Sequence, residues 1–166
     1  MLSIYLTWRL FQFTIGMESQ PLEERFFPTI SFYWEWLNDQ LRIALLHATR
    51  LCLSLIGYQS VITHDYIITI DGYRGVAIGN YCLGFQFMFF FACIIILSPF
   101  SLLVKSCSIP FGWTLIQGLN VFRFVGLNLA IIHFPGLEDK MHDYLFNAAA
   151  LAVTLLLYMK LLSKYG

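Results

Sequence analysis

The chain has 166 residues, of which 58% are hydrophobic and only 12% are charged, and its formal net charge is zero. A soluble domain of this length usually carries about twice that charged fraction, and the mean hydropathy of +0.69 favours a chain that lies mostly within a lipid bilayer. The neutral balance argues against a general attraction to nucleic acid. Four cysteines without a CxxC spacing favour neither a disulfide framework nor a metal site, and no cofactor is expected.

Residues 1–40 are interpreted as an N-terminal apolar and interfacial helical region. The first 17 residues are apolar apart from Arg9, so they could form a short span, an interfacial helix or a signal-like segment. From residue 18 to residue 39, acidic side chains are mixed with phenylalanine and tryptophan. Such a mixture suits the headgroup zone of a membrane.

Residues 41–166 are expected to form the transmembrane bundle, because about 20 mostly apolar residues cross the hydrocarbon core. The expected spans lie at about residues 41–58, 83–104, 109–134 and 143–162. The N-terminal segment would add a fifth. The sequence therefore predicts an all-α polytopic membrane protein with about four to five transmembrane helices.

A short β-hairpin is expected between the first two of these spans. Residues 66–70 are β-branched and aromatic, Asp71-Gly72 is a tight-turn signal, and residues 73–78 continue the pattern. The hairpin leads directly into Cys82 at the start of the next span.

The basic residues set the expected orientation through the positive-inside rule. Those assigned to the cytoplasmic side are Arg42, Lys105, Lys160 and Lys164. Residues 59–81 and 133–142 then face outward, with Arg74 and Lys140 as the lysine and arginine residues on that side.

Arg123 is the first polar residue that needs an explanation, because it lies well inside the span at residues 109–134. An arginine at such a depth costs at least ~2.5 kcal/mol on insertion scales, so it should face protein or water. Gln117 and Asn120 precede it at intervals of three and share its helical face. We expect a buried polar stripe that lines a cavity; a snorkelling arginine or a structural ion pair is the alternative.

Cys82 is the second, because it stands at the outward N-terminus of an expected helix, where the helix dipole stabilises a thiolate. Gln86, four residues later, would lie beneath it on the same face. The alternative is a small apolar residue with no chemical role.

His142 is the third, at the outward start of the last expected span. Cys82, Arg123 and His142 lie on three different spans and are expected near one membrane face. Together they suit acyl transfer: the thiolate attacks a carbonyl, the guanidinium stabilises the oxyanion and the imidazole moves protons. His133 is the rival base.

These motifs, in this order, resemble the exosortase/archaeosortase family of prokaryotic membrane cysteine transpeptidases. The resemblance covers about residues 67–160. It rests on the hairpin that runs into Tyr81-Cys82-Leu83-Gly84, on Asn120-Val-Phe-Arg123 inside the following span, and on His142 opening the last one. The chain is similar to a short, divergent member.

The resemblance implies that Cys82 is the nucleophile, Arg123 the transition-state stabiliser and His142 the acid/base. Gln86, Asn120 and Gln117 are expected to support the site or bind substrate. The implied partner is an exported protein with a C-terminal motif, a transmembrane helix and a basic tail, which is cleaved and passed to an acceptor. The implied location is the prokaryotic cytoplasmic (inner) membrane, in contact with lipid, with the site toward the non-cytoplasmic face.

A non-enzymatic membrane scaffold or assembly subunit is the main alternative interpretation. In that case Arg123 would pair with an acidic residue on a helix of another chain. A small transporter is less favoured, because the sequence contains no inverted repeat.

Overall fold

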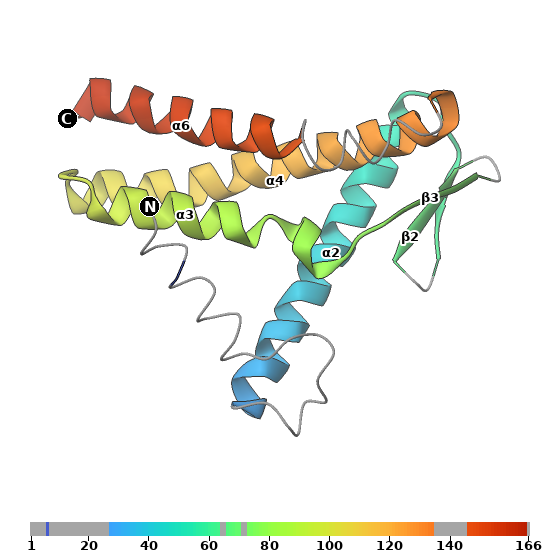
Figure 1. Ribbon diagram of the computed structural model, residues 1–166, viewed down its shortest axis with the longest axis horizontal. Helices are drawn as coiled ribbons and strands as arrows, with labels where there is room; N and C mark the ends of the chain where they lie inside the picture. Colours follow the sequence, from blue (N-terminus) through green and yellow to red (C-terminus); the bar gives the residue numbers. More distant parts are fainter. Residues whose placement is uncertain (1–5, 7–26, 64–65, 71–72, 135–145, 166) are drawn as a thin grey trace. The chain divides into compact units, whose positions relative to one another are not determined.

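The structure is a computed structural model that describes residues 6, 27–63, 66–70, 73–134 and 146–165 (Figure 1). Within these ranges the helices are α2 (Pro28–Leu55), α3 (Phe85–Leu97), α4 (Leu102–His133) and α6 (Phe146–Tyr165), together with the 3-10 helix η2 (Asn80–Leu83). The strands β1 (Ser60–Ile62), β2 (Ile67–Ile70) and β3 (Tyr73–Ala77) form one sheet in the order β1-β2-β3. The described part of the chain is therefore mostly helical, with a small antiparallel sheet.

The chain divides into two compact units, Met1–Leu41 and Arg42–Gly166, and α2 continues from the first into the second. This helix begins at Pro28, whose fixed φ suits the first turn of a helix and whose missing N–H costs nothing there. All further description concerns the second unit, which contains the sheet and the helices α3, α4 and α6.

The predicted hairpin is confirmed, because β2 and β3 pair antiparallel with Ile70 opposite Tyr73. β1 is a third strand that the sequence did not predict; it pairs with β2 so that Ser60 lies opposite Ile70. Three residues are too few to show an alternating pattern, so β1 depends on pairing and burial rather than on a local signal. Ser60, Ile68 and Ile70 make the buried face of this sheet.

The second expected span is interrupted, since α3 ends at Leu97 and the chain reverses over residues 98–101. Pro99 explains the break: it lacks an N–H and pushes the preceding residue out of the helical region, and Ser98 is extended with φ −75° and ψ 154°. The Ser101 side chain then accepts a hydrogen bond from the Val104 N–H and caps α4. Residues 105–108, expected as a loop, are therefore helical.

α3 and α4 run antiparallel side by side (Figure 1), and three contacts fix their register. The Lys105 ammonium donates to the carbonyl of Ile96 at 2.7 Å. The Trp113 indole N–H donates to the carbonyl of Met88 at 3.0 Å. Gly112 faces the ring of Phe91 so closely that a Cβ there would overlap it.

α6 completes this bundle against the same apolar core. The core consists of Phe91, Ile95, Phe100 and Ile116, against which Leu157, Tyr158 and Leu161 of α6 pack. α6 runs in the same direction as α3, so it enters the bundle at the end where α3 begins (Figure 1).

α4 is the one helix among the described residues found to be long and apolar enough to cross a membrane. α3 is apolar as well, but its 13 residues cover only about 20 Å at 1.5 Å per residue.

One part of the predicted topology is wrong. The Arg42 guanidinium lies 4.4 Å from the centre of the Tyr66 ring, whereas the sequence-based topology placed these residues at opposite membrane faces. At the other end of the same segment, the Tyr58 hydroxyl lies 2.6 Å from Nε2 of His133, at the end of α4. Residues 42–58 thus lie beside the sheet end of the bundle, and no membrane span there separates Arg42 from the sheet.

Candidate functional site

Cys82 lies in the short turn of η2, just ahead of α3. The Cys82 N–H donates to the carbonyl of Gly79 at 3.0 Å. Gly84 closes the turn with φ +76°, a left-handed conformation that glycine adopts without strain, and it is the N-cap of α3. The cysteine is 9% exposed, so it is presented by a tight, mostly buried turn rather than by the first turn of the helix.

The predicted shared face of Cys82 and Gln86 is wrong. Gln86 is exposed and belongs to α3, whereas Cys82 is buried and belongs to η2. The left-handed Gly84 between them ends the helical periodicity on which that prediction depended. The supporting role of Gln86 stays a sequence-based prediction.

The predicted polar stripe of α4 is confirmed to face protein, and it holds the turn that carries Cys82. The Gln117 side-chain amide donates to the carbonyl of Leu83 at 2.9 Å. The Asn120 amide donates to Oε1 of Gln117 at 3.2 Å, and it lies so close to Gly84 that a Cβ there would overlap it. The polar side chains of the stripe therefore hold Leu83 and Gly84, the two residues that follow Cys82.

Arg123 continues this stripe and is 7% exposed. The register that pairs Met88 with Trp113 and Leu83 with Gln117 extrapolates to place Cys82 level with residues 118–119 of α4. Arg123 is then about 7 Å further along the helix axis at 1.5 Å per residue. Helical side chains generally lean toward the N-terminus of their helix, which for Arg123 is the direction of the Cys82 level.

The two candidate histidines differ in what the structure says of them. His133 is bonded to Tyr58 at the exposed end of α4, and it lies about 20 Å beyond Asn120 along that helix. That separation argues against His133 as the base for Cys82. His142 lies outside the described residues; the first described residue of α6, Phe146, follows it by four positions.

Asn128 is a site residue that sequence reasoning missed. It is 1% exposed, its amide donates to the carbonyl of Phe124 at 2.7 Å, and its Oδ1 accepts the Val76 N–H at 3.3 Å. A Cβ on Gly75 would overlap Oδ1, so glycine lets β3 approach the helix. The signal was available, because Asn128 continues the spacing of the stripe from Asn120 through Phe124.

The strand β3 and the Cys82 turn thus contact one face of α4 at two points, Asn128 and Asn120, with Arg123 between them. This arrangement places the turn that carries Cys82 against the same helix that carries Arg123. Within the described residues there is no group of three or more His, Cys, Asp or Glu side chains that could hold a metal ion.

Comparisons with known proteins identify no family for this chain. It matches no protein-family model, no curated protein and no solved structure. The resemblance to exosortases and archaeosortases therefore depends on its sequence motifs alone.

Proposed function

We propose that the chain is an integral membrane cysteine peptidase or transpeptidase of the exosortase/archaeosortase type. In this proposal it spans the cytoplasmic membrane of a prokaryote several times. It cleaves the C-terminal sorting signal of exported proteins at the outer face and transfers the acyl group to an acceptor.

The distribution of side chains in the helices supports membrane residence. The interior carries polar residues that soluble cores rarely collect on adjacent helices: Ser108, Asn120, Arg123 and Asn128 of α4 and Thr154 of α6 are buried. The exposed surface of the same two helices carries large apolar side chains, among them Phe111, Phe122, Leu151, Leu156 and Met159. Water disfavours such an exposed surface, and lipid accepts it.

The single observation that carries the catalytic part is the seating of the Cys82 turn on the face of α4 that buries Asn120 and Arg123. A nucleophile has to be held where a stabilising group meets the charge that develops on the carbonyl oxygen. Two contacts hold the turn in place: the Gln117 amide donates a hydrogen bond to the Leu83 carbonyl, and Asn120 packs against Gly84.

The chemistry assigned to these residues is acyl transfer through a thioester. The Cys82 thiolate attacks the carbonyl carbon of the scissile peptide, and the oxyanion develops beside the Arg123 guanidinium. The C–N bond then breaks, and His142 protonates the leaving amine. An acceptor amine or hydroxyl, or water, attacks the thioester, gives its proton to His142 and releases Cys82.

The burial of Arg123 within its own unit bears on the scaffold alternative. That interpretation needs the guanidinium on an outer face, where a helix of another chain reaches it. At 7% exposure, the side chain is mostly covered by this chain itself.

Thiol reactivity tests the proposal directly in the full-length protein in membranes. With Cys52 and Cys93 replaced by alanine, the small neutral reagent methyl methanethiosulfonate reports on Cys82, and the exposed Cys107 serves as the internal reference. An activated Cys82 reacts faster than Cys107 near neutral pH in spite of its burial, and His142→Ala slows it. A Cys82 that reacts more slowly than Cys107, with or without His142, contradicts the proposal.

Processing of an exported protein tests the reaction itself. The substrate in this experiment is an exported protein that ends in a motif, an apolar helix and a basic cluster. Cys82→Ala leaves it uncut, and Arg123→Ala slows cleavage by about a hundredfold or more, the usual effect of removing an oxyanion donor. Cys107→Ala is the matched control and leaves cleavage unchanged.

A further inference from the structure

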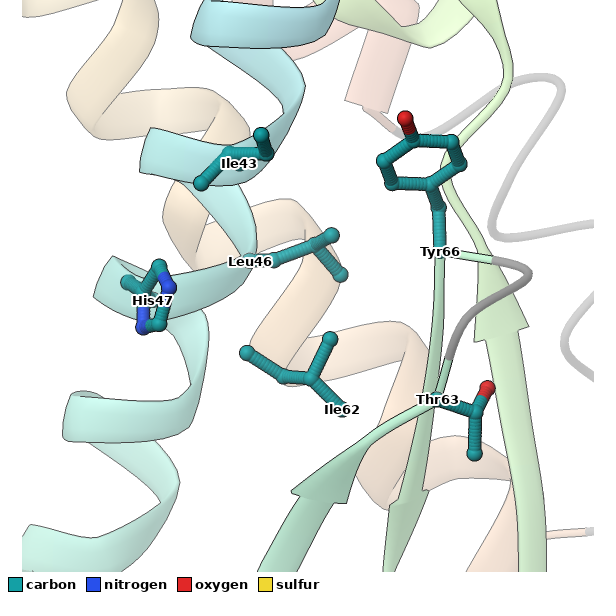
Figure 2. A pocket seen from close by; sticks show the side chains of 6 residues that line it. All are labelled: Ile43, Leu46, His47, Ile62, Thr63 and Tyr66. Carbon is teal, nitrogen blue, oxygen red and sulfur yellow. The ribbon is translucent and has the colours of Figure 1, made fainter.

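A second site lies between α2 and the first turn of the sheet (Figure 2), away from the residues assigned to catalysis. It is a cavity of about 320 Å³, within the range of small-ligand pockets. Aliphatic side chains of Ile43, Leu46 and Ile62 make its floor, and His47, Thr63 and Tyr66 complete its lining. Figure 2 shows Leu46 projecting from α2 toward the gap and the Tyr66 ring standing on the opposite wall.

Tyr66 forms a fixed wall of this cavity. Its φ of +56° is uncommon for a bulky residue and carries strain. Hydrogen bonds hold it at both ends: its N–H donates to the Thr63 carbonyl, and its carbonyl accepts the N–H of Ile78, each at 3.2 Å. The Arg42 guanidinium stacks on its ring at 4.4 Å. A wall held in this way is preorganised, so a ligand does not have to order it.

The hydrogen bond from the Ile78 N–H to the Tyr66 carbonyl links the cavity to the proposed nucleophile, Cys82. Ile78 precedes Cys82 by four residues, which cover at most about 14 Å when fully extended. With the 3.2 Å bond from Ile78 to Tyr66, the Tyr66 carbonyl lies no more than about 17 Å from Cys82. An extended peptide at ~3.3 Å per residue covers that distance in about five residues.

We propose that this cavity is a specificity pocket for the peptide to be cleaved, and that it takes one large apolar side chain within about five residues of the bond that Cys82 attacks. The assignment rests on the proposed function. The aliphatic side chains of the lining set the class of side chain, and the upper limit of about 17 Å between Tyr66 and Cys82 sets how far it can lie from the scissile bond.

Peptide vinyl sulfones test the pocket without knowledge of the natural substrate. The set has a glycine-serine chain that ends in the vinyl sulfone, with one leucine placed two to eight residues before it. Cys82 adds its sulfur to the terminal alkene carbon and a proton goes to the neighbouring carbon, so the product stays on the protein. Mass spectrometry of the full-length protein in membranes, with Cys52, Cys93 and Cys107 replaced by alanine, gives the alkylation rate.

We expect one leucine position, no more than about five residues from the warhead, to accelerate alkylation about tenfold or more over the leucine-free peptide, since burying a leucine side chain is worth at least that factor. Ile43→Trp and His47→Trp, both at exposed lining positions, narrow the cavity and abolish the acceleration. Leu51→Trp is the matched control, because Leu51 lies on the same helix, is 61% exposed and does not line the cavity.

The outcomes separate this inference from the proposed function. Alkylation of Cys82 that is equally fast for every leucine position, or a preference that both tryptophan variants retain, overturns the pocket and leaves the proposed function standing. Failure of Cys82 to react with any peptide and with methyl methanethiosulfonate overturns the proposed function, and the pocket assignment falls with it.

Discussion

Gly84 and Asn120 meet at the point where the Cys82 turn rests on α4. The glycine is needed there for two reasons: its φ of +76°, and the Asn120 amide that occupies the place of a side chain. Gly79, at the other end of the turn, has an ordinary φ of −80° and open space where a Cβ would be. The two glycines therefore make a matched pair for testing the contact between the turn and Asn120.

We expect Gly84→Ala to destabilise the protein by about 1–2 kcal/mol from the left-handed backbone alone, and by more if Asn120 is displaced. It should also change the rate at which Cys82 reacts with methyl methanethiosulfonate, because the turn loses its seat. Thermal unfolding in detergent and the labelling rate measure the two effects. Gly79→Ala should change neither; equal effects of the two variants would contradict the described packing.

Asn128→Leu should cost about 1–3 kcal/mol, because the substitution removes the acceptor of the part-buried Val76 N–H. The matched change on the same helix is Thr114→Ala, which removes an exposed hydroxyl bonded to the Pro110 carbonyl of its own helix. Thermal unfolding of the two variants compares them. A loss no larger for Asn128→Leu than for Thr114→Ala would mean that the sheet does not depend on this junction.

Spacing in the sequence predicted some of these residues and not others. Gln117, Asn120 and Arg123 lie on one side of α4 because residues three apart are neighbours on a helix surface, and in the proposed membrane their exposure to lipid would be costly. The relation between Cys82 and Gln86 failed because a left-handed glycine resets the helical phase, and its conformation depends on the packing of Asn120. Such a contact between distant residues leaves no local signal.

Helix packing between α3 and α4 depends on Gly112, which leaves room for the Phe91 ring. Gly112→Ala should therefore cost about 1–3 kcal/mol through overpacking. Gly118 lies on the same helix with open space at the Cβ position, so Gly118→Ala should stabilise by up to about 1 kcal/mol through helix propensity. The sign of the shift in melting temperature distinguishes the two variants, and two shifts of the same sign would contradict this register.

The elements themselves were predictable where the local signal was strong. Asp71-Gly72 between two β-branched stretches was enough to predict the hairpin. Hydropathy was misleading at residues 98–101. The apolar character of the sequence continues across Pro99, but the helix cannot continue there. Hydropathy was also misleading for the expected span at residues 41–58, because residues 42–58 lie beside the sheet end of the bundle; composition alone does not distinguish such a segment from a lipid-facing one.

The level of the sheet bears on which part of α4 would lie in the proposed membrane. A small sheet with open edges does not lie in hydrocarbon, and β3 contacts α4 at Asn128. The membrane part of α4 is then about residues 102–123, which cover ~33 Å and match the ~30 Å of the hydrocarbon core. This shifts the span from the expected 109–134 and moves Arg123 from its middle to its outer boundary.

Labelling with a membrane-impermeant maleimide checks this topology in a variant that lacks the other cysteines. Val61→Cys on the sheet, where the native side chain is 64% exposed, and Ile43→Cys on α2 should react from the same side. Cys107, exposed near Lys105, should react from the opposite side. If the maleimide instead labels Ile43→Cys and Cys107 from the same side, Arg42 lies at the cytoplasmic end, as the charge rule alone suggested.

The offset between α3 and α4 has a consequence for the length of the substrate. Cys82 lies about one helical turn deeper than Arg123, just inside the outer boundary of the proposed membrane span. A substrate anchored by its own apolar helix rises or sinks little, because each CH₂ drawn into water costs ~0.8 kcal/mol. The cut is then counted from the first apolar residue of the tail, so a spacer longer by a few residues would lift the scissile bond above the thiol. The position of the cut would then depend on the distance of the scissile bond from the membrane surface, and a correct motif at the wrong distance would not be cleaved.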